Sequence, residues 1–220
     1  KQVGFLAHYP INDHGTISIE DDGSIMTTWI QDTYVTSPTA SVARLSPQGD
    51  IIWIEDIYRT YGCKINDIKQ LLDGNYILSY CALVPTGYPE MSMIAFQKID
   101  TLGNLLVEKR LYNTYLREIH NTTITDNGDI LVAGFHLKEF ADTDIYQNPW
   151  IARLDESLNL LWERNLLSAD LQVTTIGPNG GDIYDIEEAI DGGIIAVGDI
   201  RDTLSNGAGE RDVWLVKLNA

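Results

Sequence analysis

Asp191-Gly192-Gly193-Ile194 repeats a phrase that occurs three times earlier in this chain of 220 residues. The earlier copies are Asp22-Gly23-Ser24-Ile25, Asp73-Gly74-Asn75-Tyr76 and Asn127-Gly128-Asp129-Ile130. Each copy joins a dipeptide typical of tight turns to the start of an apolar run, which indicates a turn between two strands. The chain therefore contains an internal repeat.

A second landmark follows each phrase: a basic residue inside an apolar run. These residues are Arg44, Lys98, Arg153 and Lys217. The turn glycines and the basic residues both recur with a period of about 50 to 65 residues, which is typical of repeat architectures built from one supersecondary unit. Because two separate landmarks keep the same period, the repeat is a property of the fold.

The third copy shows what one repeat contains. It predicts strands at 121–125, 130–135, 150–154 and 160–164, with a variable loop at 137–149. Four short strands in about 50 residues, without helical periodicity, are typical of a β-propeller blade. We therefore expect an all-β fold, a four-bladed β-propeller of four-stranded antiparallel blades.

The repeat boundaries predict a single domain, 1–220, with blades at approximately 15–58, 66–112, 120–167 and 184–220. The last blade ends after its third strand, and residues 1–10 contain an apolar run that can supply the fourth. That pairing would remove an exposed sheet edge, so we expect the N-terminal strand to close the ring. The alternative is a fragment of a longer ring.

The repeats resemble those of exported bacterial β-propeller proteins of the Bacteroidetes type, which read DGGYIVAG, DxWLVKLD and GNxxW. The resemblance is carried by 191–198, by 212–218, by Gly103-Asn104, and by Trp53 and Trp162. It departs at Val107 and at Ser157-Leu158, where the pattern has tryptophan and a turn glycine. The resemblance implies a secreted or cell-surface protein, and it specifies architecture more than activity.

The composition limits the partners. Lys and Arg total 15 against 32 Asp and Glu, giving a formal net charge of −17. Such a polyanion is repelled by nucleic acid and by anionic lipid, so we expect neither as a partner. No run approaches the ~20 apolar residues of a membrane span, so we expect no membrane insertion. The sequence leaves the oligomeric state open.

One rim of the expected propeller carries the long, irregular segments. These are 31–40, 84–90, 137–149, 167–182 and 201–212. Long loops on a rigid scaffold are where binding sites are usually built, and aromatic rings and carboxylates supply contact area and Ca²⁺ ligands. We expect a glycan or a protein to bind this long-loop rim through Tyr34, Tyr88, Phe140, Asp142, Asp144 and Tyr146.

A polar ring is a second candidate site. Asp67, Asn121 and Asp185, with Thr16, lie seven residues before the turn glycines. Pointing into a channel they could hold a cation, for which Ca²⁺ is the candidate, or they could hydrogen-bond the neighbouring blade. The histidines, His8, His14, His120 and His136, show no metal-ligand spacing, and such single histidines are usually structural.

The function that these patterns favour is a non-catalytic binding or structural module. The sequence contains no nucleophile elbow, phosphate-binding loop or Cys-x-x-Cys motif. Two alternatives stay open: a carbohydrate-active enzyme using carboxylates of the long-loop rim, and a building block of an extracellular assembly. A hairpin register that sets Cys81 opposite about Asn66 leaves Cys63 out of reach, which predicts free thiols.

Overall fold

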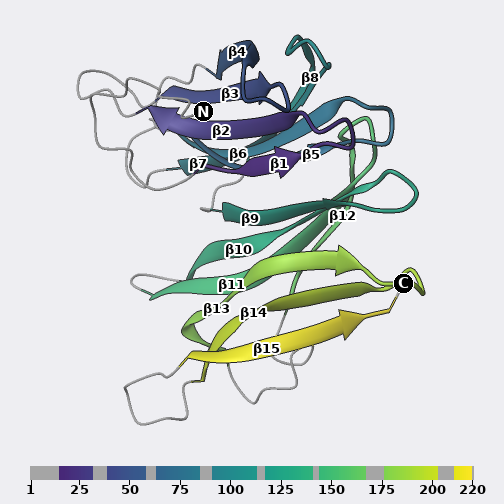
Figure 1. Ribbon diagram of the computed structural model, residues 1–220. Helices are drawn as coiled ribbons and strands as arrows, with labels where there is room; N and C mark the ends of the chain where they lie inside the picture. The colour runs from purple at the N-terminus through teal and green to yellow at the C-terminus, as the bar shows by residue number, and fades with distance from the viewer. Residues whose placement is uncertain are drawn as a thin grey trace. The chain divides into compact units, whose positions relative to one another are not determined.

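The computed structural model describes residues 15–31, 39–57, 63–84, 91–112, 117–140, 144–166, 176–202 and 211–219. In these residues the chain is all-β, as predicted, and forms four antiparallel sheets that follow one another along the sequence (Figure 1). Three sheets have four strands and the last has three. The chain divides into two compact units, Lys1–Tyr112 and Asn113–Ala220.

The first unit contains the first and second sheets. The strands of the first sheet are β1 (Ile17–Ile19), β2 (Ile25–Gln31), β3 (Thr39–Leu45) and β4 (Ile51–Ile57). Those of the second sheet are β5 (Cys63–Gln70), β6 (Tyr76–Val84), β7 (Met91–Ile99) and β8 (Leu105–Tyr112). Each strand pairs with the next one in the chain, so each sheet is a meander.

The second unit contains the third and fourth sheets. The strands of the third sheet are β9 (Arg117–Ile124), β10 (Ile130–Phe140), β11 (Asp144–Leu154) and β12 (Leu160–Asn165). Those of the fourth sheet are β13 (Ile176–Glu188), β14 (Ile194–Asp202) and β15 (Arg211–Leu218). The order is again sequential, and among the described strands β15 lies at the edge of the sheet, with Val213 and Leu215 82% and 73% exposed.

The repeated phrases form the turn between the first and second strands of every sheet, as predicted. Gly23, Gly74, Gly128 and Gly192 have φ angles of 78°, 84°, 88° and 77°. Each donates its backbone N–H to the carbonyl oxygen three residues earlier, at 2.8–2.9 Å. Only glycine adopts this left-handed conformation readily, which explains its recurrence.

Apolar side chains fill the space between the two sheets of each unit. In the first unit the core includes Met26 and Val42 from one sheet and Ile65, Leu78 and Tyr80 from the other. In the second unit Leu131 and Ile151 pack with Ile183, Ile186 and Ala196. Consecutive residues such as Leu131, Val132 and Ala133 are all fully buried, so these strands are buried on both faces, which accounts for the continuous apolar runs in the sequence.

The turn between β11 and β12 carries Leu158 where the corresponding turns carry Gly49 and Gly103. Leu158 has a φ of 64° and is fully buried. The left-handed conformation costs a non-glycine residue about 1–2 kcal/mol. Burying a leucine side chain contributes about 1.5–3 kcal/mol. Burial therefore offsets the backbone strain and allows the repeat to omit its glycine here.

We expect Leu158→Ala to destabilise the protein more than Leu158→Gly does. Both variants lose a buried side chain, at a cost of about 2–5 kcal/mol. Glycine alone also relieves the backbone strain, by about 1 kcal/mol. Denaturant unfolding of the two variants measures the difference in free energy of unfolding, and an equal or larger loss for Leu158→Gly would contradict this account.

Three of the four first strands contain a β-bulge. The register skips Asn66 in β5, His120 in β9 and Tyr184 in β13, each eight residues before its turn glycine. A bulge bends the strand and re-aims the side chains beside it. Cys81 lies opposite Lys64 rather than Asn66, while Cys63 lies opposite Ala82. One position of this shift is already present beside the turn, where Gln70 pairs with Tyr76, and the bulge adds the second. Cys81 forms no disulfide bond.

Several strands extend beyond their expected ends. The segment 137–149, expected as a loop, is largely the continuation of the β10–β11 hairpin, which pairs as far as Phe140 and Asp144. Likewise β13 begins at Ile176, inside the expected connection 167–182. The N-terminal residues expected to close the ring lie outside the described ranges. None of the described residues form a helix long and apolar enough to cross a membrane.

Candidate functional site

The six residues expected on the long-loop rim are only partly described. Tyr34, Tyr88 and Asp142 lie outside the described ranges. Phe140 is the last residue of β10, and Asp144 and Tyr146 belong to β11, so these three lie on the arms of a hairpin and not in a loop. Their role as ligand-binding residues stays a prediction.

The polar ring residues follow the bulges and bond locally. Oδ1 of Asp67 accepts the N–H of Ile68 at 2.8 Å, and Oδ1 of Asp185 accepts the N–H of Ile186 at 3.0 Å. Oδ1 of Asn121 is buried and has no hydrogen-bond partner in the described part of the chain. No group of three His, Cys, Asp or Glu residues in that part could hold a metal ion. Metal binding by this ring stays a prediction.

A cluster that the sequence pattern does not reveal lies between the two bulges of the second unit. Its members are His120 on β9, Asp182 and Tyr184 on β13, and Asp199 on β14. His120 and Tyr184 are the bulge residues, and Asp182 and Asp199 are directly opposed in the β13–β14 register. Bulges occur often beside active sites, where they place a side chain that a regular strand could not.

Each carboxylate of this cluster contacts one ring. Nε2 of His120 lies 2.8 Å from Oδ2 of Asp182. The Tyr184 hydroxyl donates to Oδ2 of Asp199 at 2.9 Å. The imidazole of His120 packs against the ring of Tyr184, with the two centroids 5.5 Å apart, and against that of Phe135 at 5.7 Å. Four polar groups are therefore held in one fixed arrangement.

The cluster extends from the protein interior to solvent. The Asp182 side chain is 8% exposed and that of His120 is 21% exposed. Asp199 is half-buried, and Tyr184 is exposed. A carboxylate pair that is oriented by rings and open on one side can contact a ligand from solvent, which distinguishes it from a buried structural pair.

Two glycines allow the strands to approach closely here. A Cβ on Gly198 would lie 1.8 Å from the carbonyl oxygen of Asp182, and a Cβ on Gly134 would lie 1.9 Å from that of Glu118. Both distances are far too short for any side chain. Gly198, the last residue of the DGGYIVAG-like phrase, is therefore required by the bulge that carries Asp182 and Tyr184.

At the other end of the sheets, an aspartate of each glycine turn binds the repeated basic residue of the same sheet. The pairs are Arg44 with Asp22 at 2.9 Å, Lys98 with Asp73 at 2.7 Å, Arg153 with Asp129 at 2.8 Å, and Lys217 with Asp191. Each basic residue thus ties the third strand of its sheet to the first turn of the same sheet. This contact explains why the two landmarks share one period.

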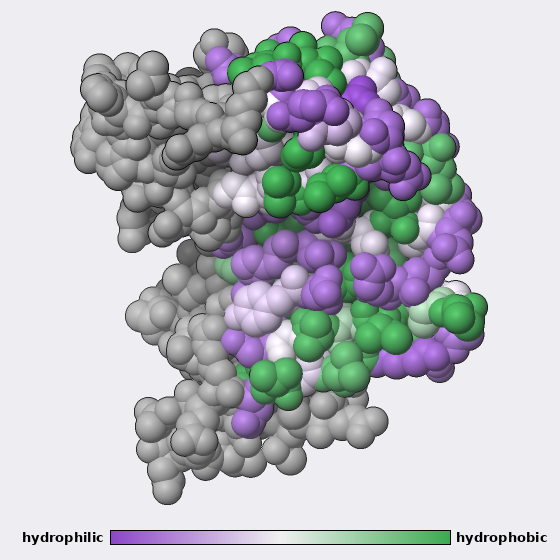
Figure 2. Space-filling view, viewed as in Figure 1, coloured by the Kyte–Doolittle hydropathy of each residue, from purple (hydrophilic) through white to green (hydrophobic). Residues whose placement is uncertain are grey.

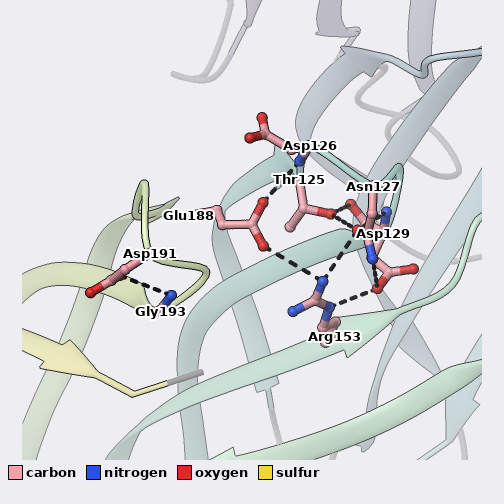
Figure 3. A network of polar contacts seen from close by, with 8 residues as sticks. All are labelled: Thr125, Asp126, Asn127, Asp129, Arg153, Glu188, Asp191 and Gly193. Carbon is pink, nitrogen blue, oxygen red and sulfur yellow. Dashed lines mark hydrogen bonds and ion pairs between the residues drawn. The ribbon is translucent and has the colours of Figure 1, made fainter.

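In the second unit the Arg153 network also joins the two sheets (Figure 3). Nη2 of Arg153 lies 3.6 Å from Oε1 of Glu188, and the backbone N–H of Asp126 donates to Oε2 of Glu188 at 2.9 Å. The side chains of these glycine turns thus make contacts that stabilise the fold.

The turn carboxylates are correspondingly stabilised in their charged form. The pKa of Asp22 lies below its ordinary value, chiefly because the Ser24 side chain donates a hydrogen bond to it. The pKa of Asp191 is also lowered, chiefly by the hydrogen bond from Lys217.

Neither a protein-family profile nor a curated protein sequence matches the chain. Among solved structures, it is similar to a mannose phosphorylase from Leishmania mexicana, solved in complex with phosphate ion, with a TM-score of 0.56, 11% identity and coverage of 93% of this chain and 66% of that chain. A hypothetical protein from Leishmania major gives a TM-score of 0.51 at 10% identity, covering 94% and 66%. An endo-arabinase from Bacteroides thetaiotaomicron gives 0.50 at 10% identity, covering 91% and 73%.

At these identities the likeness concerns the fold. The chain spans only about two thirds of the Leishmania proteins. The similar structures are β-propeller-like, which confirms the architectural part of the resemblance found in the sequence. They contradict the expected non-catalytic binding or structural module, because the two with a stated activity are enzymes, a mannose phosphorylase and an endo-arabinase. The comparisons favour the alternative, a carbohydrate-active protein.

Proposed function

We propose that this chain is part of a carbohydrate-active enzyme whose site is the cluster of His120, Asp182, Tyr184 and Asp199. The observation that carries the proposal is the pair of opposed carboxylates, Asp182 and Asp199, each in contact with a ring from a bulge. Directly opposed residues have Cα atoms about 4.5–5.5 Å apart. Side chains of directly opposed residues project from the same face of a sheet, and glycosidases use two carboxyl groups that flank the bond to be cleaved.

The two carboxyl groups divide the reaction between them. One donates a proton to the leaving-group oxygen as the bond between that oxygen and the anomeric carbon breaks. The other acts at the anomeric carbon, as a nucleophile or as the base that takes a proton from the incoming acceptor. His120 and Tyr184 are positioning residues in this scheme, since each contacts one carboxylate and fixes its direction.

Substrate cleavage tests the proposal directly. The purified chain is incubated with mannose oligosaccharides and with arabinose oligosaccharides, each with and without inorganic phosphate, and the products are separated by anion-exchange chromatography. We expect one sugar class to be cleaved, with free sugar as the product of transfer to water and sugar phosphate as the product of transfer to phosphate. An absence of cleavage above the level of an Asp182→Asn and Asp199→Asn double variant in every mixture would contradict the proposal.

We also propose that the four sheets are the blades of a four-bladed β-propeller of the Bacteroidetes type, closed by the N-terminal strand. The fourth sheet supports this, because in the described residues it has three strands and ends at β15, whereas each of the other three sheets has four. The glycan would then contact the long-loop rim, and the protein would act after export. Tyr34, Tyr88 and the other long-loop residues expected from the sequence would supply the contacts to the glycan.

Deleting residues 1–9 tests the closure. We expect faster hydrogen exchange along Val213 to Leu218, because the N–H and C=O groups on the outer edge of β15 would lose their pairing strand. Mass spectrometry of deuterium uptake measures the change peptide by peptide. Unchanged uptake in this strand would show that the N-terminal run pairs elsewhere.

A further inference from the structure

A pocket of about 500 Å³ lies between the first and second sheets of the first unit. Its lining comes from β3, β4, β6, β7, β8 and the turn between β7 and β8. The residues are Val42, Glu55, Asp56, Ile57, Leu78, Gln97, Ile99, Gly103, Asn104 and Leu105. A volume of about 300–1,000 Å³ is typical of sites for small molecules. This pocket is independent of the function proposed above.

The inner part of the pocket is aliphatic. Val42, Ile57, Leu78 and Ile99 are all buried and belong to the two facing sheets. Leu105, which is 55% exposed, stands at the outer side. Further apolar side chains of β4 are exposed nearby, and Figure 2 shows hydrophobic residues gathered at the top of the view, where Figure 1 places β4. The pocket therefore has an aliphatic inner part that can contact the hydrocarbon part of a ligand, with Leu105 at its outer side.

The polar side of the pocket is acidic. Glu55 lies directly opposite Val42 in the β3–β4 register, so both side chains lie on the face toward the second sheet. Its carboxylate has no hydrogen-bond or ion-pair partner in the described ranges. Oδ1 of Asp56 accepts a hydrogen bond from Ser41 at 2.6 Å. On the second sheet, the lining residue Gln97 donates from its Nε2 to Oε2 of Glu108 at 2.8 Å.

The lining contains acidic groups and no basic residue. The side chain of Glu55 lies close to the β7–β8 turn, since a Cβ on Gly103 would lie 3.1 Å from its Cγ and 3.1 Å from Cε3 of Trp53. This places a carboxylate that has no counter-charge within the described ranges beside the aliphatic side chains of the pocket. A sugar would need an aromatic platform, and none of the lining residues is aromatic.

We infer that this pocket binds a small aliphatic ammonium ion, with its hydrocarbon body against Val42, Leu78 and Ile99 and its charged group at Glu55. Removing apolar surface from water supplies the attraction for the body. The charged group pairs with a carboxylate that otherwise lacks a counter-charge, and the net charge of −17 raises the local concentration of cations.

The n-hexylammonium ion is the probe, and two molecules of the same chain length serve as controls. n-Hexanol keeps the body without the charge, and hexanoate reverses the charge. We expect saturable binding of n-hexylammonium, at least about fivefold tighter than that of n-hexanol, with weaker or no binding of hexanoate. Titrations followed by amide chemical shifts in NMR spectra measure the affinity and locate it at the lining residues.

Two variants separate the charge from the cavity. Glu55→Gln keeps the shape of an exposed side chain and should weaken n-hexylammonium binding at least about fivefold while leaving n-hexanol binding unchanged. Leu105→Trp should occlude the pocket and weaken the binding of both n-hexylammonium and n-hexanol. Glu156→Gln, on an exposed turn of the second unit, is the matched control and should change neither. Equal affinity for n-hexanol and n-hexylammonium, shifts outside the pocket, or unchanged binding in Glu55→Gln would each overturn the inference.

Discussion

Asparagine at position 199 should lower the rate of glycan cleavage at least about 100-fold, and asparagine at position 182 should do the same. The amide keeps the size of the side chain but can neither transfer a proton nor attack the anomeric carbon, and acid–base catalysis contributes about 10²–10⁴-fold to a rate. Initial rates of sugar release from the oligosaccharide that the parent protein cleaves measure the effect. Asp212→Asn, an exposed change on β15, is the matched control and should retain the full rate.

The rings of the cluster should behave differently from the carboxylates. Tyr184→Phe removes one hydrogen bond to Asp199, and His120→Gln removes the imidazole that contacts Asp182, so both should reduce kcat less than the loss of either carboxylate. A positioning role also predicts that kcat falls while KM stays close to that of the parent protein, because both carboxyl groups are still present and only their direction changes. Rates of Asp182→Asn and Asp199→Asn equal to that of Asp212→Asn would exclude this cluster as the site.

The sequence is sufficient for the parts of the fold that depend on local backbone geometry. The Asp-Gly turns are predictable because only glycine takes a positive φ without strain, and the four sheets follow from their period. The same pattern also predicts the ion pairs of the repeated basic residues, because each keeps a nearly constant sequence distance from its turn. These residues are Arg44, Lys98, Arg153 and Lys217.

The bulges are not predictable from the sequence, and the candidate site depends on them. A bulge inserts one residue without changing the apolar pattern on either side, so a period-2 pattern gives the wrong register beyond it. The bulge at Asn66 accounts for one of the two positions that separate the expected partner of Cys81, Asn66, from the observed one, Lys64. The expected polar ring, counted back from the turn glycines, falls on Asp67, Asn121 and Asp185, with Thr16. The residues that meet in the cluster, His120 and Tyr184, each lie one position earlier.

Asp182 and Asp199 show a second limit of sequence reasoning. The two residues lie on different strands, and the sequence around Asp182 predicts an irregular connection. Their opposition depends on the skipped residue Tyr184 and on the absence of a side chain at Gly198. Long-range pairing of this kind has no signature in the local sequence pattern. The final glycine of the DGGYIVAG-like phrase, Gly198, indicates only where the two strands approach closely.

A single methyl group added at Gly198 should therefore be severely destabilising. We expect Gly198→Ala to cost more than about 3 kcal/mol of unfolding free energy, a size that indicates a steric conflict in the core. The new Cβ would lie 1.8 Å from the carbonyl oxygen of Asp182 and 3.0 Å from Cζ2 of Trp214. The first neighbour is backbone, so relief requires moving β13 and with it Asp182 away from His120. A loss of glycan cleavage should accompany the loss of stability.

Gly74→Ala separates this steric conflict from backbone strain. Gly74 has a φ of 84°, and a Cβ there meets nothing within 4 Å, so this variant should cost only the strain of about 1–2 kcal/mol and should leave the cluster in the other unit unaffected. Urea unfolding of both variants and of the parent protein gives the comparison. Failure of Gly198→Ala to yield folded protein under conditions in which Gly74→Ala folds would agree with the prediction. A cost no greater than that of Gly74→Ala would show that β13 and β14 are not held as closely as the bulge requires.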